Sequence, residues 1–177
     1  MNDAVDLYLA QWNRERPDLD VSPMAIVGRM NRLQRFLGRG VGDGLAEHGL
    51  ERWEFDVLAT LRRSGAPHRL TAKELVRMSM VGSSAMTNRV DRLVQRGFVD
   101  REIDPDNRRR VLVGLTDEGF ELVDRVVEDH VANEARLLRG LDAGEQERLV
   151  VLLRKLLLSF GDDAPEEVTG PGRSSPE

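Results

Sequence analysis

The strongest constraint on the fold is a change of period within residues 82–115. Apolar side chains first recur at helical spacing, at Met86, Val90 and Leu93, and Gly97 then provides a helix stop. The runs "FVDREI" and "RVLVGL" that follow are β-prone, and "DPDNRR" between them contains the proline, asparagine and aspartates of a hairpin turn. The sequence therefore predicts a helix followed directly by a β-hairpin.

Two more helices are predicted upstream of this segment. The stretch "GLERWEFDVLATLRRSG" (49–65) has one apolar face, made by Trp53, Val57 and Leu61. In "TAKELVRMSM", Thr71 and Glu74 have the spacing of a capping box, which starts a short helix at the threonine. Helix, helix, arginine-bearing helix and hairpin in this order predict a winged helix-turn-helix, a mainly α fold with a small β-hairpin wing (α+β).

The residue types in the last helix and the hairpin fit DNA binding. A recognition helix needs short polar side chains near its N-terminus to reach base edges, and arginines for guanine or phosphate. The candidates on the helix are Ser83, Ser84, Thr87, Asn88 and Arg92. At the hairpin tip, Arg108 and Arg109 suit a minor groove, whose negative potential favours arginine. Each residue alone fits a solvated surface better, but helix and hairpin together favour DNA.

The charge is distributed unevenly along the chain. The formal net charge of −5 argues weakly against a nucleic-acid partner. However, residues 83–110 contain seven arginines against five acids, whereas residues 117–145 contain nine acids against three arginines. This distribution favours a basic DNA-reading segment on an acidic body.

Composition limits the other classes of protein. The 177 residues suit one domain, and the absence of cysteine excludes disulfides and thiolate metal sites. No apolar run approaches the roughly 20 residues needed to cross a bilayer. The N-terminus lacks the basic flank and apolar stretch of a signal peptide, so we expect a cytoplasmic protein with no membrane partner.

The segments before and after the predicted DNA-binding region also have helical patterns, and the last of them needs a second subunit to cover it. Ser22 and Pro23 have the pattern of an N-cap and first helical residue, and glycines at 38, 40, 42 and 44 predict a kink or frayed end. Thr116 starts a helix through about residue 139, and a capping box at Asp142 and Glu145 opens another. This last helix (144–160) is apolar almost all round, so a second subunit is its expected cover.

The segment "SSAMTNRVDRLVQRGFVDREIDPDNRRRVLVGLTDEG" resembles the MarR family of bacterial transcriptional regulators. The resemblance covers residues 24–160 and implies an obligate homodimer, joined by its N- and C-terminal helices, that binds double-stranded operator DNA. One departure is at the wing tip, where Asn107 replaces the aspartate of many relatives. Asp106 is the candidate to supply the salt bridge of that missing acid.

The N-terminal stretch "QWNRERPDLDVSPM" narrows the resemblance to the PecS/HucR branch, whose members respond to urate and have an extra helix before the common core. In that branch a tryptophan, an aspartate and two arginines form the effector site and its relay. The matching residues are Trp12, Asp56, Arg89 and Arg101. Similar regulators respond to citrate and aconitate, so the implied effector is a small anion, either a urate-like purine or a tricarboxylate.

The resemblance also implies a division of the chain. It assigns residues 1–20 to an extra helix and linker, 21–48 to a dimerisation helix, 49–115 to the DNA-binding lobe and 116–160 to C-terminal dimerisation helices. Residues 161–177 are rich in glycine, proline, serine and acids, a composition that predicts a disordered tail.

Two other classes of function were weighed. An enzyme is rejected because the three histidines are far apart in sequence, "DPDNRR" lacks the glycine and glutamate of a calcium loop, and the glycines lack dinucleotide-binding spacing. No metal and no cofactor is predicted. A winged-helix adaptor that binds proteins and never contacts DNA is the other alternative, and the acidic pI of about 5.4 favours it slightly.

Overall fold

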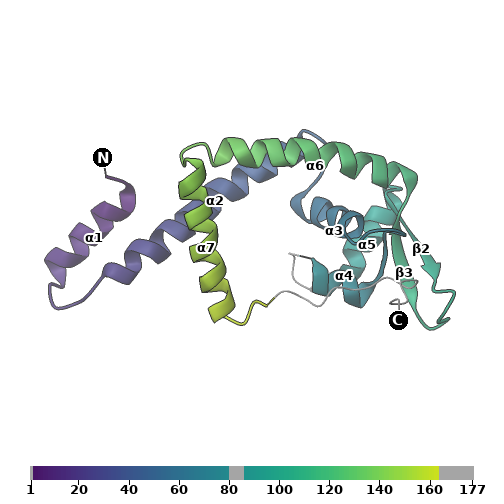
Figure 1. Cartoon of the computed structure of the whole chain (residues 1–177), viewed down its shortest axis with the longest axis horizontal. Helices are drawn as coiled ribbons and strands as arrows, with labels where there is room; N and C mark the ends of the chain where they lie inside the picture. The colour runs from purple at the N-terminus through teal and green to yellow at the C-terminus, as the bar shows by residue number, and fades with distance from the viewer. Residues whose placement is uncertain (1, 80–85, 164–177) are drawn as a thin grey trace. The chain divides into compact units, whose positions relative to one another are not determined.

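The computed structural model describes residues 2–79 and 86–163 (Figure 1). Within these ranges the chain forms two units, Met1–Asp43 and Gly44–Glu177. The first contains α1 (Ala4–Glu15) and most of α2 (Ser22–Ala46). The second contains three strands and five helices, the last of them α6 (Asp117–Leu137) and α7 (Ala143–Ser159).

In the first unit, α1 begins and ends at local signals. The Asp3 side chain caps the helix by accepting from the backbone N–H groups of Val5 and Asp6, and Asp6 completes a capping box. The helix ends at Glu15, before Pro17, which cannot donate a backbone hydrogen bond. A helix of 12 residues is marginal alone, so α1 depends on packing against α2.

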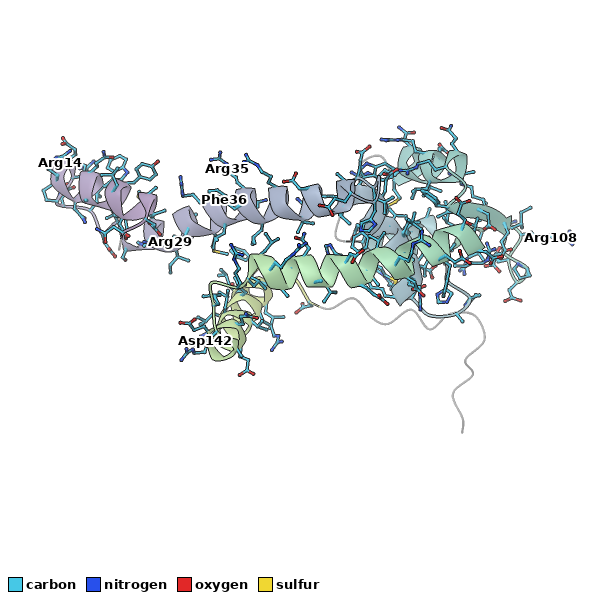
Figure 2. All side chains as sticks on the ribbon, turned by 90° about the horizontal axis from the view of Figure 1, so that it is seen from above. Arg14, Arg29, Arg35, Phe36, Arg108 and Asp142 are labelled. Atoms are coloured by element: carbon cyan, nitrogen blue, oxygen red, sulfur yellow. The ribbon has the colours of Figure 1, made fainter. Side chains whose placement is uncertain are left out.

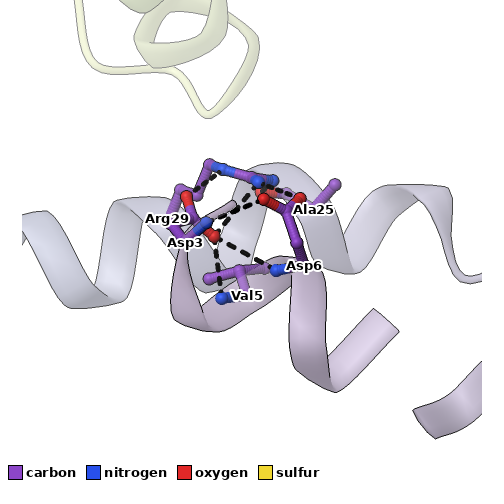
Figure 3. Close-up of polar contacts among 5 residues, drawn as sticks. All are labelled: Asp3, Val5, Asp6, Ala25 and Arg29. Atoms are coloured by element: carbon purple, nitrogen blue, oxygen red, sulfur yellow. Dashed lines mark hydrogen bonds and ion pairs between the residues drawn. The ribbon is translucent and has the colours of Figure 1, made fainter. Parts of the chain in front are cut away.

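A small apolar contact and an ion cluster join α1 to α2. Val5 is 4% exposed, and a Cβ on Gly28 would lie 3.3 Å from its Cγ1, so the two helices approach closely there. Arg29 donates from Nε to Asp3 Oδ2 at 2.8 Å and from Nη2 to Asp6 Oδ1 at 2.6 Å (Figure 3). Desolvation raises the pKa of Asp3, but hydrogen bonds from the Asp6 N–H, Arg29 and the Val5 N–H outweigh it, and the net pKa is lowered.

The structure corrects two expectations for α2. Ser22 is the first helical residue instead of the N-cap, and its backbone N–H donates to Asp20 Oδ1 at 2.9 Å. The predicted frayed end at the glycines is not found either, because the helix is continuous through Ala46. Gly44 sits where a Cβ would lie 2.7 Å from the Asn133 side chain, so one glycine of the run is explained by close packing against α6.

In the second unit, helices and a three-stranded sheet form the winged lobe (Figure 1). The helices are α3 (Arg52–Arg63), α4 (Ala72–Met78) and α5 (Met86–Gln95), and the strands are β1 (Arg69–Thr71), β2 (Val99–Ile103) and β3 (Val111–Leu115). The sheet is antiparallel with the order β1-β3-β2. The hairpin and the Thr71–Glu74 capping box are confirmed, whereas sequence analysis missed β1.

The core of this lobe collects apolar side chains from every element of the lobe and from α6. Fully or almost fully buried are Val57, Leu58, Leu61, Leu75, Val90, Leu93, Val99, Val113, Val123 and Val126. Three of these ten side chains come from α3, more than from any other element, so α3 is the central helix of the lobe. The α+β winged fold predicted from sequence is confirmed.

The last two helices begin at the predicted residues. Thr116 caps α6 by accepting from the Gly119 N–H, and Asp142 with Glu145 form the capping box of α7. No residue of α7 is buried within the single chain, which leaves its apolar side chains uncovered. Within the described residues, no helix is long and apolar enough to cross a membrane. From residue 164 onwards, the expected disordered tail lies outside the described residues.

Candidate nucleic-acid interface

The apolar face of α5 fixes this helix on the winged lobe. Met86, Val90 and Leu93 are buried, as their spacing predicted, and Gly97 ends the segment with a φ of 78°. Thr87 and Asn88 are therefore exposed on the other face of the helix. Ser83 and Ser84 lie outside the described residues. The structure thus leaves two of the predicted base-reading side chains accessible.

A buried ion pair, missed from sequence, ties the end of α5 to α3. Glu54 is 1% exposed, and both its carboxylate oxygens accept from Arg96 Nη1 at 2.8 Å. Arg96 also donates to the Gly49 carbonyl oxygen at 3.0 Å and lies over the Phe98 ring. A signal was present in the sequence, because Glu54 stands three and four residues before the buried Val57 and Leu58 and so on an apolar face.

Arg92 is already engaged in the free chain. Its Nη2 donates to Glu51 Oε1 at 2.7 Å, and its guanidinium lies 4.7 Å from the Trp53 ring centroid. The Trp53 indole N–H donates to the other Glu51 oxygen at 2.8 Å. The hydrogen bonds from Arg92 and then Trp53 lower the pKa of Glu51. Trp53 is half-buried, and the guanidinium groups of Arg89 and Arg92 lie over its ring.

The wing turn is organised by Asp104 and Asn107. Asp104 is 5% exposed, its N–H donates to the Arg110 carbonyl oxygen at 3.0 Å, and Asn107 Oδ1 accepts the Arg109 N–H at 3.1 Å. Asp106 donates its backbone N–H to Asp104 Oδ1 and forms no ion pair with any described residue, so the substitute salt bridge expected there is not found.

The arginines of the wing tip point into solvent. Arg108 and Arg109 are exposed, and Figure 2 shows Arg108 at the outer end of the hairpin. Together with the exposed face of α5, they give one lobe both a helix and a wing with side chains suited to DNA.

The predicted effector residues are divided between the two units. Trp12, 46% exposed, belongs to the first unit, and the other three residues belong to the second. Asp56 is half-buried on α3, one helical turn after Trp53, and Arg89 has its guanidinium 5.8 Å from the Trp53 ring centroid. Arg89 of α5 is thus near α3 at Trp53, one helical turn before Asp56.

Arg101 lies elsewhere in the lobe. Its Nη1 is 2.6 Å from Asp91 Oδ1, and Asp91 is two residues from Arg89, roughly 200° around the helix. With Thr87 and Asp91, Arg101 lines an open hollow of about 290 Å³ between α5 and the hairpin. In this chain Arg101 is thus a neighbour of α5, bound to it through Asp91. No group of three or more histidine and acidic side chains in the described ranges could hold a metal ion.

An exposed polar helix face beside a basic wing defines a winged helix-turn-helix of the DNA-binding class. Residues 48–110 match the family model described as the MarR family. The chain is also 42% identical over 146 residues to the HTH-type transcriptional regulator PecS of Dickeya dadantii, covering 82% of this chain and 88% of that protein. The chain belongs to the MarR family, as its resemblance to the PecS branch implied, and is a DNA-binding transcriptional regulator.

Solved structures agree with this assignment. A MarR variant from E. coli in complex with operator DNA matches with a TM-score of 0.66 and 26% identity, over 82% of this chain and 97% of that one. BpsR of Bordetella bronchiseptica, whose DNA binding is regulated by 6-hydroxynicotinic acid, matches with a TM-score of 0.67 and 25% identity, over 79% and 94%. These relatives are regulators, so the rejection of an enzyme is confirmed.

Proposed function

We propose that this regulator is a homodimeric repressor that binds a pseudo-palindromic operator and leaves it when a small anion such as urate binds. The observation that carries the proposal is the pairing, on one lobe, of the exposed Thr87 and Asn88 with the exposed Arg108 and Arg109. In this proposal, Ser83, Ser84, Thr87, Asn88 and Arg92 face the major groove, and the two wing arginines enter the minor groove.

Uncovered apolar side chains support the dimer. In α2, Ile26 is 63% and Phe36 61% exposed, and in α7 Leu152 is 64% exposed. Such surfaces are stable in water when a second subunit covers them. We assign residues 21–48 and 116–160 to dimerisation and residues 49–115 to DNA binding. A two-fold axis then implies half-sites about 10 bp apart, one turn of DNA.

The anionic effector is supported by residue chemistry and by a relative. Trp12 offers an indole face on which a planar anion can stack, and a guanidinium pairs with such an anion in a fixed plane. Asp56 would be a like charge next to the anion, so binding disfavours its position and can shift Arg89 and α5. The regulation of BpsR by 6-hydroxynicotinic acid, a planar acid, is consistent with this chemistry.

DNA binding is tested by gel shift on the DNA upstream of the protein's own gene, repeated across salt concentrations. Arg109→Ala should weaken binding to all sequences and reduce the salt slope by about two, because each subunit of the homodimer loses one phosphate or groove contact. The matched control is Arg125→Ala, an exposed arginine on α6. If Arg109→Ala changes neither affinity nor slope, the wing does not contact DNA.

The effector is tested with urate, xanthine, citrate and cis-aconitate, each added to the protein–DNA complex. Urate should quench Trp12 fluorescence and release DNA, and Trp12→Phe should keep operator affinity while weakening the response, since a smaller ring stacks less. Because Trp53 also fluoresces, the difference between wild type and Trp12→Phe isolates the Trp12 signal. Release by citrate alone would identify a tricarboxylate regulator, and an unchanged response after removal of residues 1–20 would place the pocket away from Trp12.

A further inference from the structure

One side chain crosses the whole sheet at the base of the wing. In the strand register, Arg69 of β1 is opposite Gly114 of β3, and Gly114 is opposite Asp100 of β2. The Arg69 guanidinium reaches across the middle strand to both oxygens of Asp100, with Nη1 2.5 Å from Oδ1 and Nη2 3.0 Å from Oδ2. Its Nε is also 3.3 Å from Glu102 Oε1, two residues further along β2.

This crossing is possible only because the middle residue is glycine. A Cβ on Gly114 would lie 2.5 Å from Arg69 Cγ and 2.6 Å from Nη1, closer than real contacts allow. The arginine side chain is only 20% exposed, whereas the two carboxylates are each 46% exposed. The aliphatic part of the Arg69 side chain therefore covers the backbone of β3, and its planar guanidinium makes a bidentate contact with Asp100.

The contact joins strands that have no backbone pairing with each other. β1 pairs with β3 alone, so β2 is the outer strand of the hairpin and Arg69 links it directly to β1. Arg101, the next residue of β2, alternates to the other face of the sheet and binds Asp91 of α5. The outer strand is thus held from both faces just before it enters the wing turn.

We propose that Arg69 is a positioning residue for DNA binding: through Gly114 and Asp100 it fixes the angle at which the wing arginines meet the minor groove. This inference rests on the proposed contact between the wing and DNA. The hairpin pairs with only three residues of β1, so it could rotate at its base, and such a rotation displaces the tip of the hairpin most. The rigid contact between the Arg69 guanidinium and Asp100 opposes this rotation.

The test uses full-length protein and a duplex selected from random-sequence DNA by the wild type. Arg69→Gln keeps much of the side-chain length without the charge, and Gly114→Ala keeps both charges but blocks their path. Each should weaken binding by about tenfold or more and reduce the salt slope by about two, since both wings of the homodimer lose an arginine contact. Arg62→Gln is the matched control, because it breaks the ion pair of 2.6 Å with Asp124 outside the wing.

Hydroxyl-radical footprinting separates positioning from folding. The two variants should lose protection only at the flanking minor grooves, keep the central protection by α5, and melt within a few degrees of wild type. Exchanging the charges, with Arg69→Asp combined with Asp100→Arg, should restore the flanking protection. Loss spread evenly over the footprint, or intact flanking protection in both variants, would overturn the inference. Absence of flanking protection in the wild type would instead overturn the proposed wing contact itself.

Discussion

Val5→Ala should weaken the docking of α1 on α2 while leaving the winged lobe folded. Val5 is the one buried residue of α1, and it packs on Gly28, where no side chain can fill the space left by truncation. Removing two methyl groups costs about 1.6 kcal/mol at about 0.8 kcal/mol per buried carbon. Alanine recovers about 0.5 kcal/mol through its better helix propensity. The net loss of about 1 kcal/mol raises the population of undocked α1 about fivefold.

The assay is the rate of trypsin cleavage after Arg14, whose side chain is 71% exposed and becomes cleavable when the helix opens. When closing is fast relative to cleavage, this rate follows the opening equilibrium, so it should rise about fivefold in the variant. Leu7→Ala is the matched control, since Leu7 is 57% exposed in the single chain and should leave the rate nearly unchanged. Equal cleavage rates for wild type and Val5→Ala would refute the idea that this contact holds α1.

Three further predictions follow from other contacts. Gly119→Ala should lower stability by about 2 kcal/mol or more, measured by thermal melting, because its Cβ would clash with the Phe98 carbonyl oxygen. Glu51→Gln should tighten operator binding in a fluorescence titration, since the competing carboxylate no longer holds Arg92; equal or weaker binding would contradict this. The docking of α1 can be followed by amide hydrogen-exchange protection, which should be constant well above pH 3.8 and weaken below that pH. The pKa of Asp3 is lowered on folding, so the stabilisation from its carboxylate is lost as the pH falls through the pKa of the folded state. Protection that does not depend on pH would contradict this prediction.

Sequence alone determined where α4, α6 and α7 begin and that a hairpin follows α5. The capping boxes at Thr71 and Glu74, and at Asp142 and Glu145, join residues three positions apart, so both partners are visible in one short stretch of sequence. The same locality explains the errors. Glycine propensity predicted a kink or frayed end in α2 because it ignores the close approach that Gly44 permits, and the three residues of β1 are too few to show a period.

Only the tertiary structure decided how α5 and the wing are held on the lobe. Glu54 and Arg96 are 42 positions apart, and Arg69 and Asp100 are 31 apart, so no local pattern pairs them. Each of these charges could have found other partners from its sequence position. Folding selects among them because burial removes water from the carboxylate of Glu54, and because Gly114 alone leaves a path across the sheet. A buried charge without a partner costs free energy, so packing decides which residues pair. The sequence by itself identifies only the candidate residues.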